Sequence, residues 1–179
     1  YAYISDGGIQ EEISQGAGRI AGHLGLDNLI MYYDANNIQL STTVEEVDSE
    51  DVAAKYKAWG WHVIEIDGCC PEAIRKALRE AKATVGQPTL IIGKTIMGRG
   101  AVGPNGENYE NRVNTHGQPL SAAGASIEAT IKNLGGDPEA PFQIFPDVQE
   151  LYTARLQELR ELAKARKQEE KTWREENPV

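Results

Sequence analysis

The sequence has few cysteines, fewer basic than acidic residues, and no long hydrophobic run. Its two cysteines, Cys69 and Cys70, are adjacent, which excludes a disulfide framework and is typical of a reducing compartment. The formal net charge is −9, so the chain lacks the basic surface that nucleic acids need, and an anionic membrane would repel it. No apolar stretch reaches the roughly 18 residues of a membrane span. We therefore expect a cytoplasmic protein that binds neither nucleic acid nor membrane.

The sequence also lacks an initiating Met. Its 179 residues, of which 40% are hydrophobic, suffice for one globular domain with a substantial core. The chain nevertheless opens directly on residues 1–5, which have the composition of a core strand. Such a strand needs neighbours in a sheet, and some of them must come from elsewhere. We therefore expect a fragment of a longer chain whose first domain is incomplete at its N-terminus.

Short apolar runs alternate with segments of helical periodicity. Four runs have the composition of strands and are flanked by turn residues: 1–5, 29–34, 62–66 and 89–94. Three segments between them predict helices: 9–24, 51–59 and 71–84. The first of these helices carries one apolar stripe, made of Ile13, Ala17, Ile20, Ala21 and Leu24. The alternation predicts an α/β fold, an open and mostly parallel sheet with helices on both faces.

The regular pattern ends after residue 94. Residues 98–121 are polar and rich in glycine, and they are too long for an ordinary connection, so we expect a functional or mobile loop. A short helix near 125–134 and a charged helix over about 148–176 are predicted beyond it. The apolar positions of the charged helix become sparse toward its end, which is typical of a linker helix.

Polar residues that could hold a charged ligand follow the first two predicted strands. Asp6 and Gly7 follow the first strand, and Asn36 follows the second, thirty residues after Asp6. Ligands of open α/β sheets bind beyond the carboxyl ends of the strands, where helix starts favour phosphate. A carboxylate, an amide oxygen, a backbone carbonyl, phosphate oxygens and a water make the hard oxygen set that Mg²⁺ prefers. The spacing predicts a metal-bound diphosphate, whereas a simple helix cap is the alternative role of Asp6.

The segment SDGGIQEEISQGAGRIAGHLGLDNLIMYYDANNIQL resembles the thiamine diphosphate signature, a GDG followed about thirty residues later by an Asn pair, in its transketolase form. The segments YKAWGWHVIEIDG, PTLIIGKTIMGRG and THGQPLS are similar to successive transketolase segments. The resemblance covers essentially the whole chain. It implies the thiamine diphosphate-binding fold, with residues 1–145 as the C-terminal portion of the diphosphate- and metal-binding domain. Residues 146–179 would be the linker helix toward a second domain that this sequence does not contain.

The resemblance implies a metal and diphosphate site. It makes Asp6, Asn36 and the main-chain carbonyl of Ile38 the metal ligands. Gly7 would contact the diphosphate through its backbone. The implied cofactors are thiamine diphosphate and Mg²⁺, with Ca²⁺ or another divalent cation as a substitute.

Further roles follow from the same resemblance. Glu11 matches the family's glutamate at the subunit interface, near the partner's catalytic carboxylate, and His116 matches the histidine that touches diphosphate and substrate. Met97 falls where the family packs an aliphatic residue on the thiazolium. Three departures stand out: Ser5 replaces the first glycine of GDG, Gly16 stands where many relatives have a second interface glutamate, and the loop before His116 is longer than in the best-known members.

The implied function is that of a transketolase, a metal-binding transferase of the pentose phosphate pathway. It moves a two-carbon ketol unit between sugar phosphates, and it works as a homodimer formed through the full-length protein. This chain would supply the diphosphate and metal half of the site and would be inactive in isolation. Three alternatives stay open. The chain could belong to another thiamine diphosphate enzyme, such as deoxyxylulose phosphate synthase or the E1 component of 2-oxo acid dehydrogenases. It could also be a non-catalytic or split-subunit cofactor-binding module, or a plain structural fragment.

Overall fold

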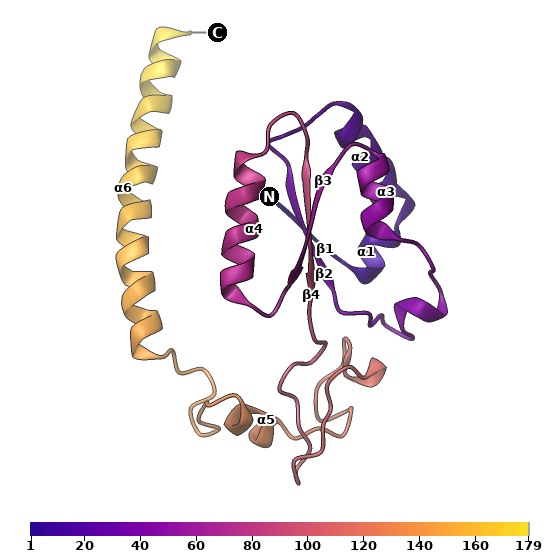
Figure 1. Cartoon of the computed structure of the whole chain (residues 1–179). Helices are drawn as coiled ribbons and strands as arrows, with labels where there is room; N and C mark the ends of the chain where they lie inside the picture. Colours follow the sequence, from indigo (N-terminus) through magenta and orange to yellow (C-terminus); the bar gives the residue numbers. More distant parts are fainter. Residues whose placement is uncertain (179) are drawn as a thin grey trace. The chain divides into compact units, whose positions relative to one another are not determined.

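A computed structural model describes residues 1–178, which fall into two compact units that divide after Gly136. The first unit contains four strands: β1 (Ala2–Ser5), β2 (Ile30–Ala35), β3 (His62–Asp67) and β4 (Thr89–Lys94). All neighbouring strands pair in parallel, in the order β1-β2-β4-β3 (Figure 1). The predicted strands and the parallel sheet are therefore confirmed.

Helices cover both faces of this sheet, as the alternating pattern predicted. The helices α1 (Asp6–Gln10), α2 (Glu12–His23) and α3 (Val52–Ala58) lie on one face, and α4 (Pro71–Ala83) lies on the other (Figure 1). The chain crosses the sheet in one direction from β1 through β2 to β3 and then returns to β4. Because right-handed crossovers are the rule, this reversal places the last helix on the opposite face.

The core lies on both sides of β4, the strand whose residues are most completely buried. Leu90 and Ile92 pack with Tyr56 and Trp61 beneath the first three helices, whereas Ile91 packs with residues of α4. Such continuous burial is what a strand between two helical layers requires. The sheet is thereby fixed as the rigid support for whatever binds at its carboxyl edge.

The predicted helix over residues 9–24 is wrong in its start and its continuity. The chain is already helical at Asp6, and it breaks at Glu11, whose backbone is extended with φ −63° and ψ 130°. Of the predicted apolar stripe only Ala21 is buried, while Ile13 is 87% exposed and Ile20 is 57% exposed. The small residues Gly18 and Gly22 let α2 approach the rest of the unit closely. This close approach turns the larger apolar side chains of α2 outward.

The long segment after β4 folds back on itself. Residues 101–103 and 107–109 pair in an antiparallel manner, with Tyr109 N–H donating to the carbonyl of Ala101 at 3.0 Å. The short helices η2 (Val113–Thr115) and α5 (Ile127–Asn133) follow, and the Ser126 side chain caps α5 by accepting from Ala129 N–H at 3.1 Å. A further short helix, η1 (Val44–Glu46), lies between β2 and α3.

The second unit is dominated by α6 (Pro146–Glu176), which is 31 residues long and begins at a proline in its first turn. None of its residues is buried, and ion pairs at helical spacing line it, including those between Lys164 and Glu161 and between Arg174 and Glu170. The predicted charged helix is therefore confirmed, with a start two residues earlier. None of the helices within residues 1–178 is both long and apolar enough to cross a membrane.

Candidate functional site

A cavity of about 580 Å³ opens at the carboxyl ends of β1, β2 and β4. This is the edge at which ligands of open α/β sheets bind. The cavity is lined by Asp6, Tyr33, Ala35, Asn36, Asn37, Ile38, Thr43, Val44, Glu45, Lys94, Thr95 and Asn111. The three predicted metal ligands are thus brought together, although they come from two strand ends that lie far apart in the sequence.

Asp6 is the most deeply buried charged residue of this cavity, with 2% of its surface exposed. The Tyr33 hydroxyl donates to its Oδ1 at 2.6 Å, and the backbone N–H of Asn36 donates to its Oδ2 at 3.1 Å. Burial raises the pKa of the Asp6 carboxyl, whereas these hydrogen bonds favour its charged form. Burial and the bond to Asp6 also raise the pKa of Tyr33, which keeps its hydroxyl a donor.

A tight turn after β2 presents the next two predicted ligands. Asn37 adopts a left-handed backbone with φ 66°, a conformation that Asn tolerates better than most residues. The Asn36 side-chain oxygen accepts from Ile38 N–H at 3.0 Å, and the carbonyl of Asn37 accepts from Val44 N–H at 3.1 Å. Both ends of the turn are therefore fixed by hydrogen bonds.

The donor set in this cavity fits a hard divalent cation. Each Asp6 oxygen accepts one hydrogen bond and keeps a second lone pair, as does the Asn36 side-chain oxygen. Ile38, whose carbonyl is the third predicted ligand, lines the same cavity. Within residues 1–178 no group of three or more His, Cys, Asp or Glu side chains could hold a metal. A metal here would therefore depend on mixed carboxylate, amide and carbonyl oxygens, which Mg²⁺ and Ca²⁺ accept.

The predicted cofactor contacts Gly7 and Met97 lie beside the cavity without lining it. Gly7 follows Asp6 in α1 and is exposed, and a Cβ atom there would meet no other atom within 4 Å. Met97 exchanges two hydrogen bonds with Asn111: its N–H donates to the side-chain oxygen at 3.2 Å, and its carbonyl accepts from the Asn111 N–H at 2.9 Å. Asn111 lines the cavity, so this pairing holds Met97 near its rim.

The two predicted catalytic residues are not among those that line the cavity. Glu11 is exposed at the break between α1 and α2. His116 follows η2 and is partly buried, and its Nδ1 is a buried nitrogen without a hydrogen-bond partner. The next residue, Gly117, lies close to Leu40, since a Cβ atom there would be 3.3 Å from the Leu40 side chain. The segment around His116 therefore approaches the chain that follows the turn after β2.

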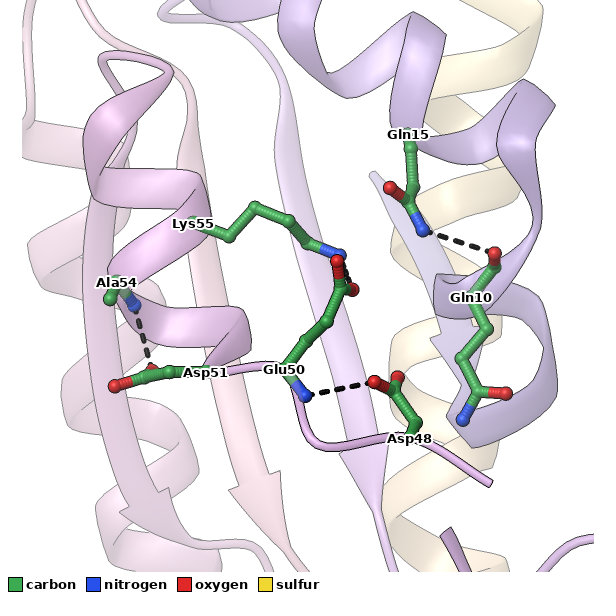
Figure 2. A network of polar contacts seen from close by, with 7 residues as sticks. All are labelled: Gln10, Gln15, Asp48, Glu50, Asp51, Ala54 and Lys55. Atoms are coloured by element: carbon green, nitrogen blue, oxygen red, sulfur yellow. Dashed lines mark hydrogen bonds and ion pairs between the residues drawn. The ribbon is translucent and has the colours of Figure 1, made fainter. Parts of the chain in front are cut away.

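The break that carries Glu11 is supported by polar contacts (Figure 2). The Gln15 side chain donates to the carbonyl of Gln10 at 3.0 Å and so bridges the two helices. Nearby, Glu50 N–H donates to Asp48 at 2.8 Å, and Glu50 pairs with Lys55 of α3 (Figure 2). The bond from Gln15 links the backbone on either side of Glu11, whose own side chain stays exposed.

The cavity residues that sequence reasoning missed include Tyr33, Lys94, Thr95 and Asn111. Lys94 ends β4 and Thr95 follows it, so the rule of strand ends that found Asn36 could have found them. Tyr33 lies in a strand that has the composition of a core strand, and no neighbouring residue indicates that its hydroxyl has a functional role. Asn111 is separated from Met97 by 14 residues, and only the folded loop brings the two together.

Comparison with known protein families places the chain in one of them. The family described as transketolase, thiamine diphosphate binding domain, matches residues 1–179, and the chain belongs to this family. Transketolase 2 of Xanthobacter flavus is 40% identical to it over 156 residues, which are 87% of this chain and 22% of that protein. A transketolase of Nostoc sp. is 39% identical over 150 residues, 83% of this chain and 21% of the relative.

Solved structures agree with this assignment. Transketolase from Leishmania mexicana superimposes with a TM-score of 0.83 at 31% identity, covering 98% of this chain and 25% of that chain. A Pichia stipitis transketolase in complex with sedoheptulose-7-phosphate also gives 0.83, at 30% identity and with the same coverage. The chain therefore spans about a fifth to a quarter of the length of these relatives. The predicted family and fold are confirmed.

Proposed function

We propose that this chain supplies the diphosphate- and metal-binding half of a transketolase active site. The protein that carries it transfers a two-carbon ketol unit from a ketose phosphate to an aldose phosphate in the pentose phosphate pathway. The observation that carries the proposal is the cavity where Asp6, Asn36 and Ile38 meet at the carboxyl edge of the sheet, in a member of this family. A relative solved with sedoheptulose-7-phosphate supports sugar phosphates as the substrates.

Different residues at the cavity bind the metal and the diphosphate. When bound, thiamine diphosphate supplies the carbon nucleophile and the electron sink of ketol transfer. Asp6, Asn36 and the Ile38 carbonyl hold Mg²⁺, or Ca²⁺ in its place, and the metal offsets the charge of the diphosphate. The Gly7 backbone N–H donates to that diphosphate, and Lys94 adds a positive charge at the same cavity. On a chain with a net negative charge, these groups supply the local positive charge and hydrogen-bond donor that a diphosphate needs.

Two further contacts concern the reacting end of the cofactor and the substrate. Met97, whose backbone is held by Asn111, would pack on the thiazolium. His116 donates from its imidazole to the diphosphate and to the substrate. The Nδ1 of His116 has no hydrogen-bond partner among the described residues, and a buried polar atom without one needs an explanation such as a bound group.

The active protein is a homodimer in the cytoplasm. The outward apolar face of α2, which carries Ile13, Ile20 and Leu24, is the surface that the second subunit covers. Glu11 lies at the start of this helix, where a partner's carboxylate can approach it. A reducing compartment is supported by the two cysteines, both of which are free.

We propose a cofactor domain over residues 1–145 and a linker over residues 146–179, in which Pro146–Glu176 form α6. The boundary falls where α6 begins, at Pro146. The division into compact units comes earlier, after Gly136, so residues 137–145 group with α6 rather than with the sheet.

The test uses the natural protein that carries this chain. Thiamine diphosphate binding is measured with and without Mg²⁺, and ketol transfer is assayed from a ketose phosphate to an aldose phosphate. We expect both activities in the parent and in a Glu12→Gln control, which removes an exposed carboxylate of the adjoining helix. We expect Asp6→Ala to lose metal-dependent cofactor binding.

Three results would favour the alternatives. No metal-dependent cofactor binding in the complete assembly would indicate a plain structural fragment. Cofactor binding with decarboxylation of a 2-oxo acid, or with synthesis of deoxyxylulose phosphate, in place of ketol transfer would indicate another thiamine diphosphate enzyme. Cofactor binding without any turnover in the complete assembly would indicate a non-catalytic module.

A further inference from the structure

We propose that Tyr33 is a positioning residue, whose hydroxyl holds the Asp6 carboxylate in the orientation that a divalent cation requires. This inference rests on the proposed function, because it assigns a role to Tyr33 within the same metal site. It concerns a residue that no motif marks and that the fold alone brings to Asp6.

The contact is short, buried and formed from a rigid element. Tyr33 lies in β2, between β1 and β4, and only 6% of its surface is exposed. Its hydroxyl donates to Asp6 Oδ1 at 2.6 Å, and both groups are buried. Its ring packs in the core cluster with Met31, Leu90 and Ile92. The donor therefore has a fixed position that does not depend on a mobile loop.

A second donor completes the hold on the carboxylate. Asn36 N–H donates to Asp6 Oδ2 at 3.1 Å, so each oxygen accepts one hydrogen bond from β2 or from the turn that follows it. Two donors on two oxygens prevent rotation about the Cβ–Cγ bond. The lone pairs that remain then have fixed directions at the cavity, where Asn36 and Ile38 supply the other oxygens.

Positioning matters here because Asp6 has no cationic partner. No ion pair within residues 1–178 includes it, and its carboxylate is nearly inaccessible to water. Residues that orient metal ligands through hydrogen bonds change metal affinity by about 10- to 100-fold when they are replaced. The Tyr33 hydroxyl makes a hydrogen bond of this kind to the predicted metal ligand Asp6.

The experiment measures Mg²⁺ affinity in the natural protein that carries this chain. MgCl₂ is titrated at a fixed saturating concentration of thiamine diphosphate, with binding followed by the change in tryptophan fluorescence. Tyr33→Phe keeps the buried ring and removes the hydroxyl. We expect Mg²⁺ to bind about 10- to 100-fold more weakly. The Mg²⁺ concentration for half-maximal turnover rises by the same factor, and saturating Mg²⁺ restores kcat.

Tyr3→Phe is the matched control. The Tyr3 hydroxyl donates to Asp34 at 2.7 Å, so this variant also removes a Tyr to Asp hydrogen bond from the same end of the sheet. Asp34 does not line the cavity, and we expect Mg²⁺ affinity within about twofold of the parent.

A double variant guards against a loss of stability that only mimics the effect. In an Asp6→Asn background, Tyr33→Phe should cause no further loss of Mg²⁺ affinity, since Tyr33 acts through Asp6. Equal losses in both backgrounds, equal weakening by Tyr3→Phe and Tyr33→Phe, or unchanged affinity in Tyr33→Phe would each overturn the inference while the proposed function stands. A parent protein without Mg²⁺-dependent binding of thiamine diphosphate would overturn the proposed function and this inference together.

Discussion

Gly22 of α2 approaches the turn between α3 and β3 more closely than any larger residue could. A Cβ atom at this position would lie 1.9 Å from the carbonyl oxygen of Trp59 and 3.0 Å from the Trp61 ring. Since non-bonded heavy atoms pack best at about 3.5–4.0 Å, Gly22→Ala must separate helix and turn by roughly 1.6 Å. That separation also breaks the hydrogen bond from the Trp61 indole to the Gly18 carbonyl, which is 2.7 Å long.

The magnitude follows from three contributions to the free energy of unfolding. Overpacking costs about 1–3 kcal/mol, and the lost buried hydrogen bond costs about 1 kcal/mol. Replacing a glycine inside a helix by alanine returns about 1 kcal/mol. We therefore expect Gly22→Ala to destabilise this region by about 1–3 kcal/mol, which opens it roughly 5- to 150-fold more often.

Native-state hydrogen exchange on peptides from α2, α3 and β3 measures this opening in the natural protein. Gly16→Ala is the control in the same helix, because a Cβ atom there meets nothing within 4 Å. It should slow exchange by stabilising the helix by about 0.5–1 kcal/mol. Unchanged or slower exchange in Gly22→Ala would refute the close packing that turns the apolar face of α2 outward.

Three further predictions concern the cavity. Burial raises the pKa of the Asp6 carboxyl above its ordinary value of 3.8, so the folded state binds the carboxyl proton more tightly than the unfolded state does. The contribution of Asp6 to the free energy of unfolding therefore falls as pH rises through the raised pKa. Thermal melts without metal should show this fall in the parent but not in Asp6→Asn, and excess Mg²⁺ at neutral pH should offset it. Asn111→Gly tolerates the left-handed backbone, φ 54°, but loses the hydrogen bond from Met97 N–H to the Asn111 side chain. Because such a bond is worth about 1 kcal/mol, calorimetry should show thiamine diphosphate binding roughly fivefold more weakly. Lys94→Met should weaken cofactor binding about two- to fivefold and reduce the dependence of that binding on salt, because a partly screened positive charge is lost. Lys94→Arg keeps the charge and should change neither the affinity nor its dependence on salt.

Much of the candidate site could be predicted because its signals are local. Strand composition and turn residues are properties of neighbouring positions, so the ends of β1 and β2, and with them Asp6 and Asn36, were found from the sequence. That both residues reach one cavity follows from topology, since parallel strands end at the same edge.

Other features of the site depend on contacts between distant positions. The bond from Tyr33 to Asp6 joins residues 27 apart, and the pairing of Asn111 with Met97 depends on the path of a whole loop. Neither a buried tyrosine nor a loop asparagine carries a local mark of these roles.

The sequence by itself determined the order of strands and helices, the α/β class and the carboxylate and amide at the two strand ends, because short-range periodicity and turn chemistry control them. Only the tertiary structure decided that the helix breaks at Glu11, that Ile13 and Ile20 face outward, and that Tyr33 donates to Asp6. The physical reason is that packing selects among the faces that a helix offers. The small residues of α2 allow a close approach that outweighs the burial of its larger apolar side chains against the sheet.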